Sequence, residues 1–146
     1  MKTHVTVVGL TAALAAFLML PQGCSPPVRD LDQQQVRELA DFDEVMWFLA
    51  TIADPGFSVA KSADPSKLSE ADFARFADMG RRVPWGAQRL VEPAFSRGPE
   101  FDGFAADLRK KAEALLTAAE GRRGQDSTEA ALSMKATCKG CHDKFR

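Results

Sequence analysis

The end of the chain, AALSMKATCKGCHDKFR (residues 130–146), decides how the rest of the sequence is interpreted. It contains Cys138 and Cys141, three positions apart, followed directly by His142. On a helical turn, thiols at this spacing reach the two vinyl groups along one edge of a haem, and the adjacent imidazole reaches the iron. The motif therefore predicts one covalently attached haem c, with thioether bonds to Cys138 and Cys141 and His142 as an axial iron ligand.

Three other interpretations of the paired cysteines fit the sequence less well. A redox-active dithiol usually opens a helix beside a strand, and the chain has no strand pattern. A zinc site would need a second pair of ligands, and the only other histidine is His4, near the N-terminus. A disulfide between Cys138 and Cys141 would close too short a loop to stabilise the fold much.

Residues 1–23 are predicted to be a secretion signal. Lys2 supplies a positive charge, and an uncharged, largely apolar run follows from Val5 to Leu20. As a helix this run would span roughly 24 Å at about 1.5 Å per residue, which is short for a bilayer core of about 30 Å. A cleaved signal fits better than a transmembrane helix. The chain is therefore expected to be exported to the periplasm, which agrees with c-type haem being attached outside the cytoplasm.

Cys24 lies at a junction that resembles that of bacterial lipoproteins, Gly23-Cys24 followed by Ser25-Pro26-Pro27. Lipidation would tether the protein to a membrane through Cys24, with residues 24–29 as the tether. The leucine usual at three residues before the cysteine is missing, because Leu20 lies one position too early. The alternative is a secreted protein in which Cys24 is a free, unpaired thiol, which is unusual in an oxidising compartment.

Apolar residues at helical spacing predict two amphipathic helices in the first half of the remaining chain. The first runs over residues 30–53 and is ended by Asp54-Pro55-Gly56, since proline and glycine break helices. The second begins at Ser69, whose pairing with Asp72 forms a capping box. Pro84-Trp85-Gly86 is expected to kink or end this second helix.

Two more helices are predicted in the second half, over residues 99–121 and from Asp126 into the haem motif. Four amphipathic helices within residues 30–146 predict an all-α domain, an antiparallel four-helix bundle with haem on its C-terminal helix. The hydrophobic fraction of 45% allows a buried core. A net charge of −1 without a concentrated basic face excludes a typical nucleic-acid-binding protein.

A haem motif at the extreme C-terminus resembles the class II cytochromes c, which include cytochrome c′ and cytochrome c556. The resemblance rests on residues 138–146, on the alanine-rich helix before them, and on Val83-Pro84-Trp85. It covers most of residues 30–146. It implies a four-helix bundle in which the first helix covers the iron face opposite His142, and a homodimer formed through that helix, as family members often have.

The resemblance also makes the residue that faces the iron from the first helix decisive. That residue is apolar in cytochrome c′, whose iron is five-coordinate, and a methionine in the c556 type, whose iron is six-coordinate. Met46 lies in the middle of the predicted first helix and is the candidate sixth ligand. Met79 is expected in the core, and Met134 lies on the same helix as His142 and so on the wrong side.

The alternative is that Met46 only packs in an apolar wall, to which Trp47 and Phe48 also contribute as haem-pocket residues. Six-coordination favours a one-electron carrier that exchanges electrons with redox partner proteins. Five-coordination favours a protein that binds NO or CO. No enzyme activity is expected, because a peroxidase would need a distal histidine and no catalytic pair of acidic residues is evident.

Overall fold

The computed structural model describes residues 30–146, which form an all-α bundle, as predicted. The predicted signal, Cys24 and the tether lie outside the described residues. Five α-helices and one short 3₁₀ turn follow one another: α1 (Gln33–Glu38), α2 (Phe42–Ser62), η2 (Pro65–Lys67), α3 (Glu70–Leu90), α4 (Pro99–Glu120) and α5 (Gly124–Phe145). Within residues 30–146, no helix is long and apolar enough to cross a membrane.

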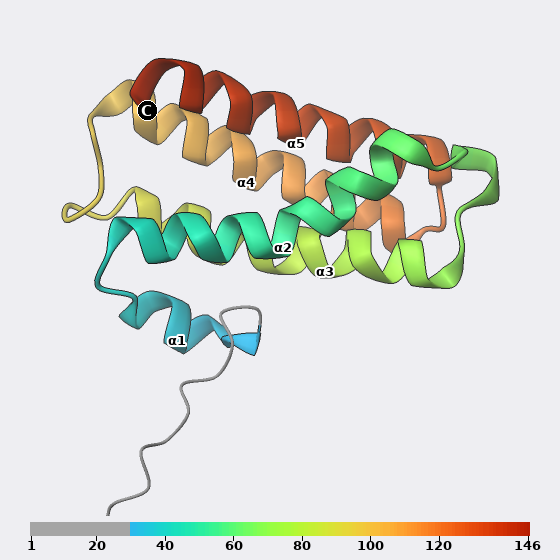
Figure 1. Ribbon diagram of the computed structural model, residues 1–146, viewed down its shortest axis with the longest axis horizontal. Coiled ribbons are helices and arrows are strands. Elements are labelled where there is room, and N and C mark those ends of the chain that lie inside the picture. The colour runs from blue at the N-terminus through green and yellow to red at the C-terminus, as the bar shows by residue number, and fades with distance from the viewer. Residues whose placement is uncertain (1–29) are drawn as a thin grey trace, which may run out of the picture.

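The four long helices, α2 to α5, form the bundle, and each runs antiparallel to the one before it (Figure 1). The closest neighbours are α3 with α4, α4 with α5, and α2 with α3, while α2 also packs against α5 and closes the ring. Fully buried side chains from all four helices fill the middle, including Phe48, Phe76, Met79, Leu115 and Met134. The short α1 lies outside the ring, against α3, with Val36 buried beneath it.

The single first helix predicted over residues 30–53 is wrong, because the structure has two helices there. The chain is extended at Leu39, where α1 has ended, and α2 begins after Asp41. The Asp41 carboxylate accepts a hydrogen bond from the backbone N–H of Asp43 at 2.7 Å. This N-cap, followed by acidic residues that favour the positive end of the helix dipole, starts a new helix at Phe42.

The predicted end at Asp54-Pro55-Gly56 is also wrong, since α2 continues to Ser62. Proline inside a helix removes one hydrogen bond and costs about 3 kcal/mol. Continuation of α2 keeps Phe57 and Ala60 buried in the core, and burial of one large side chain contributes about 1.5–3 kcal/mol. Packing therefore outweighs the local cost, and α2 changes direction partway along its length (Figure 1).

The other helix boundaries lie close to their predicted positions. The capping box of Ser69 and Asp72 is confirmed at the start of α3. That helix passes through Pro84 to Leu90 and does not end at it. The predicted third helix is confirmed as α4, and α5 begins at Gly124, two residues before the expected cap at Asp126.

Candidate functional site

A cavity of about 610 Å³ lies between α2 and α5, toward the end of the bundle where α5 finishes. Its volume is within the range of about 300–1,000 Å³ typical of ligand and cofactor pockets. The walls are mostly apolar and come from four helices. They include Phe42, Met46, Leu49, Ala50 and Ala53 of α2, Val83 of α3, Phe101, Phe104 and Leu108 of α4, and Met134 and Phe145 of α5.

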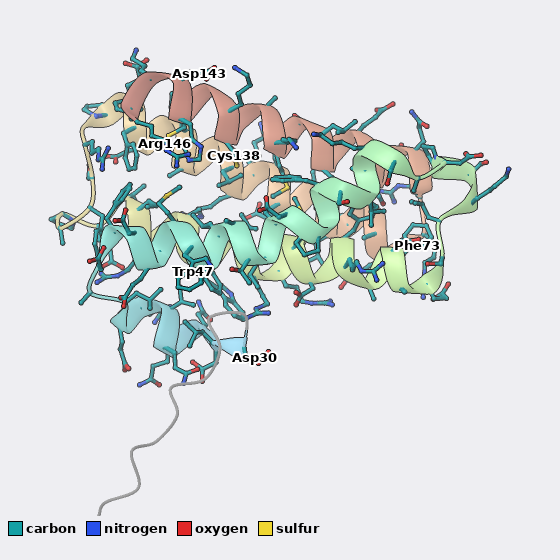
Figure 2. All side chains as sticks on the ribbon, viewed as in Figure 1. Asp30, Trp47, Phe73, Cys138, Asp143 and Arg146 are labelled. Carbon is teal, nitrogen blue, oxygen red and sulfur yellow. The ribbon has the colours of Figure 1, made fainter. Side chains whose placement is uncertain are left out.

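The wall formed by α5 carries all three residues of the predicted attachment motif. Cys138, Cys141 and His142 each line the cavity. They share one face because helical residues three and four positions apart lie above one another. Both thiols are free and half-buried. Figure 2 shows Cys138 on the side of α5 that faces α2, while Asp143, which is exposed, lies on the opposite side of the same helix.

The wall formed by α2 brings Met46 to the same cavity, opposite the motif. Met46 is half-buried, and Trp47 beside it also lines the cavity although its side chain is 66% exposed. Phe48 was expected in the pocket wall but is not among the lining residues. It points into the core, fully buried, with the guanidinium carbon of Arg82 5.6 Å from its ring centroid. A shift of one residue along a helix turns the side chain by about 100°, which separates these neighbours.

The other two methionines also lie where the helix pattern placed them. Met79 is fully buried in the core and does not line the cavity. Met134 is fully buried on α5, one turn before Cys138, and contributes to the wall that carries the motif. Met46 is therefore the one methionine among residues 30–146 that reaches the cavity from a helix other than α5.

The basic residues that stand out in the sequence, Arg81-Arg82 and Lys110-Lys111, do not line the cavity. Arg81 pairs with Glu120 at 3.1 Å. The cations that do line it are Arg97, from the loop between α3 and α4, and Arg146 at the C-terminus. Sequence reasoning missed both. Arg97 lies in a loop without periodicity and Arg146 follows the last helical residue, so neither position carries a signal for where its side chain turns.

A polar network fixes α5 against α4 next to the attachment motif. The buried Thr137 hydroxyl donates to Asp107 Oδ2 at 2.7 Å and accepts from Lys111 Nζ at 2.7 Å. Lys111 Nζ also lies 2.7 Å from Asp107 Oδ2. The hydrogen bond from Lys111 and that from Thr137 hold the pKa of the Asp107 carboxyl below its usual value. Because Thr137 directly precedes Cys138, the network fixes the rotation of α5 that turns the cysteine inward.

Burial makes both cysteine thiols weaker acids than usual. It raises the pKa of Cys138 to about 11, with a further contribution from the neighbouring Cys141. Burial also raises the pKa of Cys141, against the opposing positive charge of Arg97. Since the thiolate is the reactive form, burial in the closed bundle lowers the reactivity of both thiols.

The residues around the cavity fit a haem c. Two thiols at the required spacing and an imidazole converge on one side of it. The remaining walls are apolar and aromatic, which suits a porphyrin and keeps water from its faces. At the end of the cavity, Phe145 makes edge-to-face contacts with Phe101 and Phe104, with ring centroids 5.4 and 6.2 Å apart. No group of three or more His, Cys, Asp or Glu residues that could hold a metal ion occurs within residues 30–146.

The family model described as cytochrome c′ matches residues 57–146, which run from the second half of α2 to the last residue and include the whole attachment motif. The chain belongs to the cytochrome c′ family. Membership implies a c-type haem protein with covalently bound haem c and its iron. Comparison with curated proteins and with solved structures found no match.

The match to the cytochrome c′ family begins at Phe57, after most of the α2 residues that line the cavity. Met46 and Trp47 therefore lie outside the matched residues. Family membership accounts for the bundle and for the haem, and does not extend to these two residues of the cavity wall.

Proposed function

We propose that this protein is a monohaem cytochrome that carries single electrons between redox partner proteins. The observation that supports the proposal most strongly is the convergence of Cys138, Cys141 and His142 on one cavity, with Met46 on the opposite wall. Cys138 and Cys141 would hold the haem through thioether bonds, and His142 would bind the iron. When bound, haem c supplies a couple of ferric and ferrous iron.

Met46 is proposed as the sixth ligand. Apart from the acidic Asp43 and Asp54, it is the α2 residue of the cavity wall whose side chain can bind iron. It lines the cavity and is half-buried at the edge of the core. A thioether ligand stabilises ferrous iron and raises the reduction potential. Fixed ligands on both faces also limit the change in structure between the two redox states, which favours rapid electron transfer.

Binding of NO or CO is the second candidate function. It is favoured by the wall next to Met46, where Leu49, Ala50 and Ala53 are apolar and mostly small. If Met46 only packs there, an apolar pocket remains on the α2 side of the cavity. A vacant iron position in such a pocket would accept a small diatomic gas.

We further propose that the protein acts in the periplasm after export, and that a lipid on Cys24 tethers it to a membrane. The support comes from the sequence of residues 1–29 and from haem c being attached outside the cytoplasm. A homodimer is compatible with family membership. The exposed Trp47 on α2 is consistent with a contact through that helix.

The test is the optical spectrum of the purified ferric and ferrous protein, with and without CO. The protein should be expressed in a host that matures c-type cytochromes. A low-spin spectrum that CO leaves unchanged is the expected result and supports the electron carrier. A high-spin spectrum that changes on addition of CO would contradict ligation by Met46 and favour gas binding. Absence of covalent haem from the protein would overturn both functions.

A further inference from the structure

Arg97 lies at the rim of the haem cavity, on the loop that joins α3 to α4. Its guanidinium carbon lies 4.3 Å from the centroid of the Phe42 ring and 5.9 Å from that of Phe101. One guanidinium nitrogen donates a hydrogen bond to the backbone carbonyl of Phe145 at 2.8 Å. The side chain is therefore held at a defined place between the start of α2 and the end of α5, although it is exposed.

The charge of Arg97 is not balanced by a carboxylate. Among residues 30–146, Arg97 forms no ion pair, whereas Arg75, Arg81, Arg89, Arg122 and Arg123 each pair with an acidic side chain. Its hydrogen-bond partner is a neutral carbonyl oxygen, and its other contacts are aromatic faces. Several N–H groups of the Arg97 guanidinium thus remain available to an anion. A guanidinium binds a carboxylate through two parallel hydrogen bonds.

The opposite charges on the cavity wall are distributed unevenly. Asp54 lies three turns along α2 from Phe42, about 18 Å at 1.5 Å per residue. This stretch of α2 is near Cys138 and Lys135 of α5. Asp43, the other acidic residue of the wall, is exposed at the beginning of α2. Arg97 and Arg146 supply the positive charges at the end of the cavity where α5 finishes. Both cations of the wall therefore lie at that end, together with the exposed Asp43, and a group with negative charge would find its partners there.

A haem carries two propionate carboxylates on the edge away from its vinyl groups. With haem in this cavity, we propose that the guanidinium of Arg97 binds one of these propionates. Its contacts with the rings of Phe42 and Phe101 hold the guanidinium in place. This assignment rests on the proposed function, since it requires haem attached at Cys138 and Cys141. Arg146 is the less suitable partner, because within residues 30–146 no hydrogen bond or ion pair of its side chain fixes its position, and only its backbone N–H is bonded, to His142.

The test compares Arg97→Gln, Arg97→Lys and Arg146→Gln in the haem-loaded protein. Loss of a bound cation destabilises the more electron-rich ferrous state. We expect Arg97→Gln to shift the ferric–ferrous equilibrium at least threefold toward ferric, about 28 mV at 59 mV per tenfold. Arg97→Lys should show a smaller shift, because lysine keeps the positive charge but cannot form two parallel hydrogen bonds to a carboxylate. Arg146→Gln, which removes a cation from the same rim, should shift the equilibrium less than Arg97→Gln.

A second measurement tests the contact between Arg97 and the propionate directly, whereas the shift in the equilibrium reports the effect of the charge. Nuclear Overhauser contacts between the Arg97 side chain and the propionate methylenes are expected in the ferrous protein and should be lost in Arg97→Gln. Haem attachment without these contacts, and with equal shifts in Arg97→Gln and Arg146→Gln, would overturn the role of Arg97 and leave the proposed function intact. Protein without covalent haem would overturn the proposed function itself.

Discussion

Gly80 on α3 lies so close to Leu116 on α4 that no side chain fits between the two helices. A methyl group at Gly80 would lie 2.8 Å from both the Cβ and the backbone nitrogen of Leu116, and 2.9 Å from the carbonyl oxygen of Ala112. Because two of these atoms belong to the backbone, they cannot move aside alone. The pair therefore sets the separation of α3 and α4, two helices that also contribute walls to the haem cavity.

Gly80→Ala is expected to lower the free energy of unfolding by about 1–3 kcal/mol, the usual cost of overpacking a close contact. The measurement is denaturant unfolding of the haem-loaded protein, followed by far-ultraviolet circular dichroism. Gly103→Ala is the matched control, because a methyl group at this exposed position on α4 meets nothing within 4 Å. It should stabilise the protein by about 0.4–1 kcal/mol through helix propensity and backbone entropy. Equal effects of the two variants would contradict the close approach.

Thr128 carries a buried hydroxyl with no hydrogen-bond partner among residues 30–146. A buried polar group without a partner costs about 1–3 kcal/mol. Thr128→Val keeps the shape and removes the hydroxyl, so we expect it to raise the free energy of unfolding by about 1 kcal/mol. Thr137→Val is the control and should destabilise by about 1 kcal/mol, because it breaks the hydrogen bonds to Asp107 and Lys111. Chemical denaturation that ranks the two variants in the reverse order would rule out this account.

Met46→Leu is expected to convert the iron from six- to five-coordinate. Leucine has a similar volume and no atom that binds iron, so the ferric spectrum should become high-spin and the ferrous protein should bind CO. Met134→Leu serves as the control within the same cavity, because Met134 lies on the wall that carries His142. It should leave the spectrum low-spin. Identical spectra for wild-type protein and Met46→Leu would show that Met46 only packs.

Substitution of both motif cysteines is expected to abolish covalent haem. Cys138→Ser and Cys141→Ser should each retain one thioether bond at best, and the double variant none. Mass spectrometry of the denatured protein measures this directly as the presence or absence of one haem mass. Cys24→Ser is the control: it should keep the haem and instead move the protein from the membrane fraction to the soluble fraction. Haem that stays covalently bound in the double variant would refute the attachment site.

Helix positions followed from local signals where those signals were strong. The capping box at Ser69 marked the start of α3, and the periodic apolar residues of α4 gave its length. Pro55 misled the prediction because the rule that proline ends a helix is local, whereas burial of Phe57 beyond it is a tertiary effect. At Pro84 the prediction left a kink or an end open, and α3 continues to Leu90. The break before α2 could have been found from Asp41, an N-cap residue followed by two acidic residues.

The site was predictable to the extent that it lies in one short motif. Cys138, Cys141 and His142 share a helix face by spacing alone, so their convergence needs no knowledge of the fold. Met46 and Phe48 differ by two residues, and only the rotation of α2 against its neighbours decides which of them reaches the cavity. Arg97 depends on the path of a loop, which no periodic pattern describes.

The weak acidity of the half-buried thiols has a consequence for biogenesis. Closure of the bundle disfavours the thiolate form of Cys138 and Cys141, yet their addition to a haem requires reactive, accessible sulfur. We therefore expect attachment to be faster before α5 docks onto α2 than afterwards. A chain exported without its prosthetic group would keep the apolar faces of α2 and α5 hydrated. We expect such a chain to be degraded, so that only protein that has acquired haem accumulates.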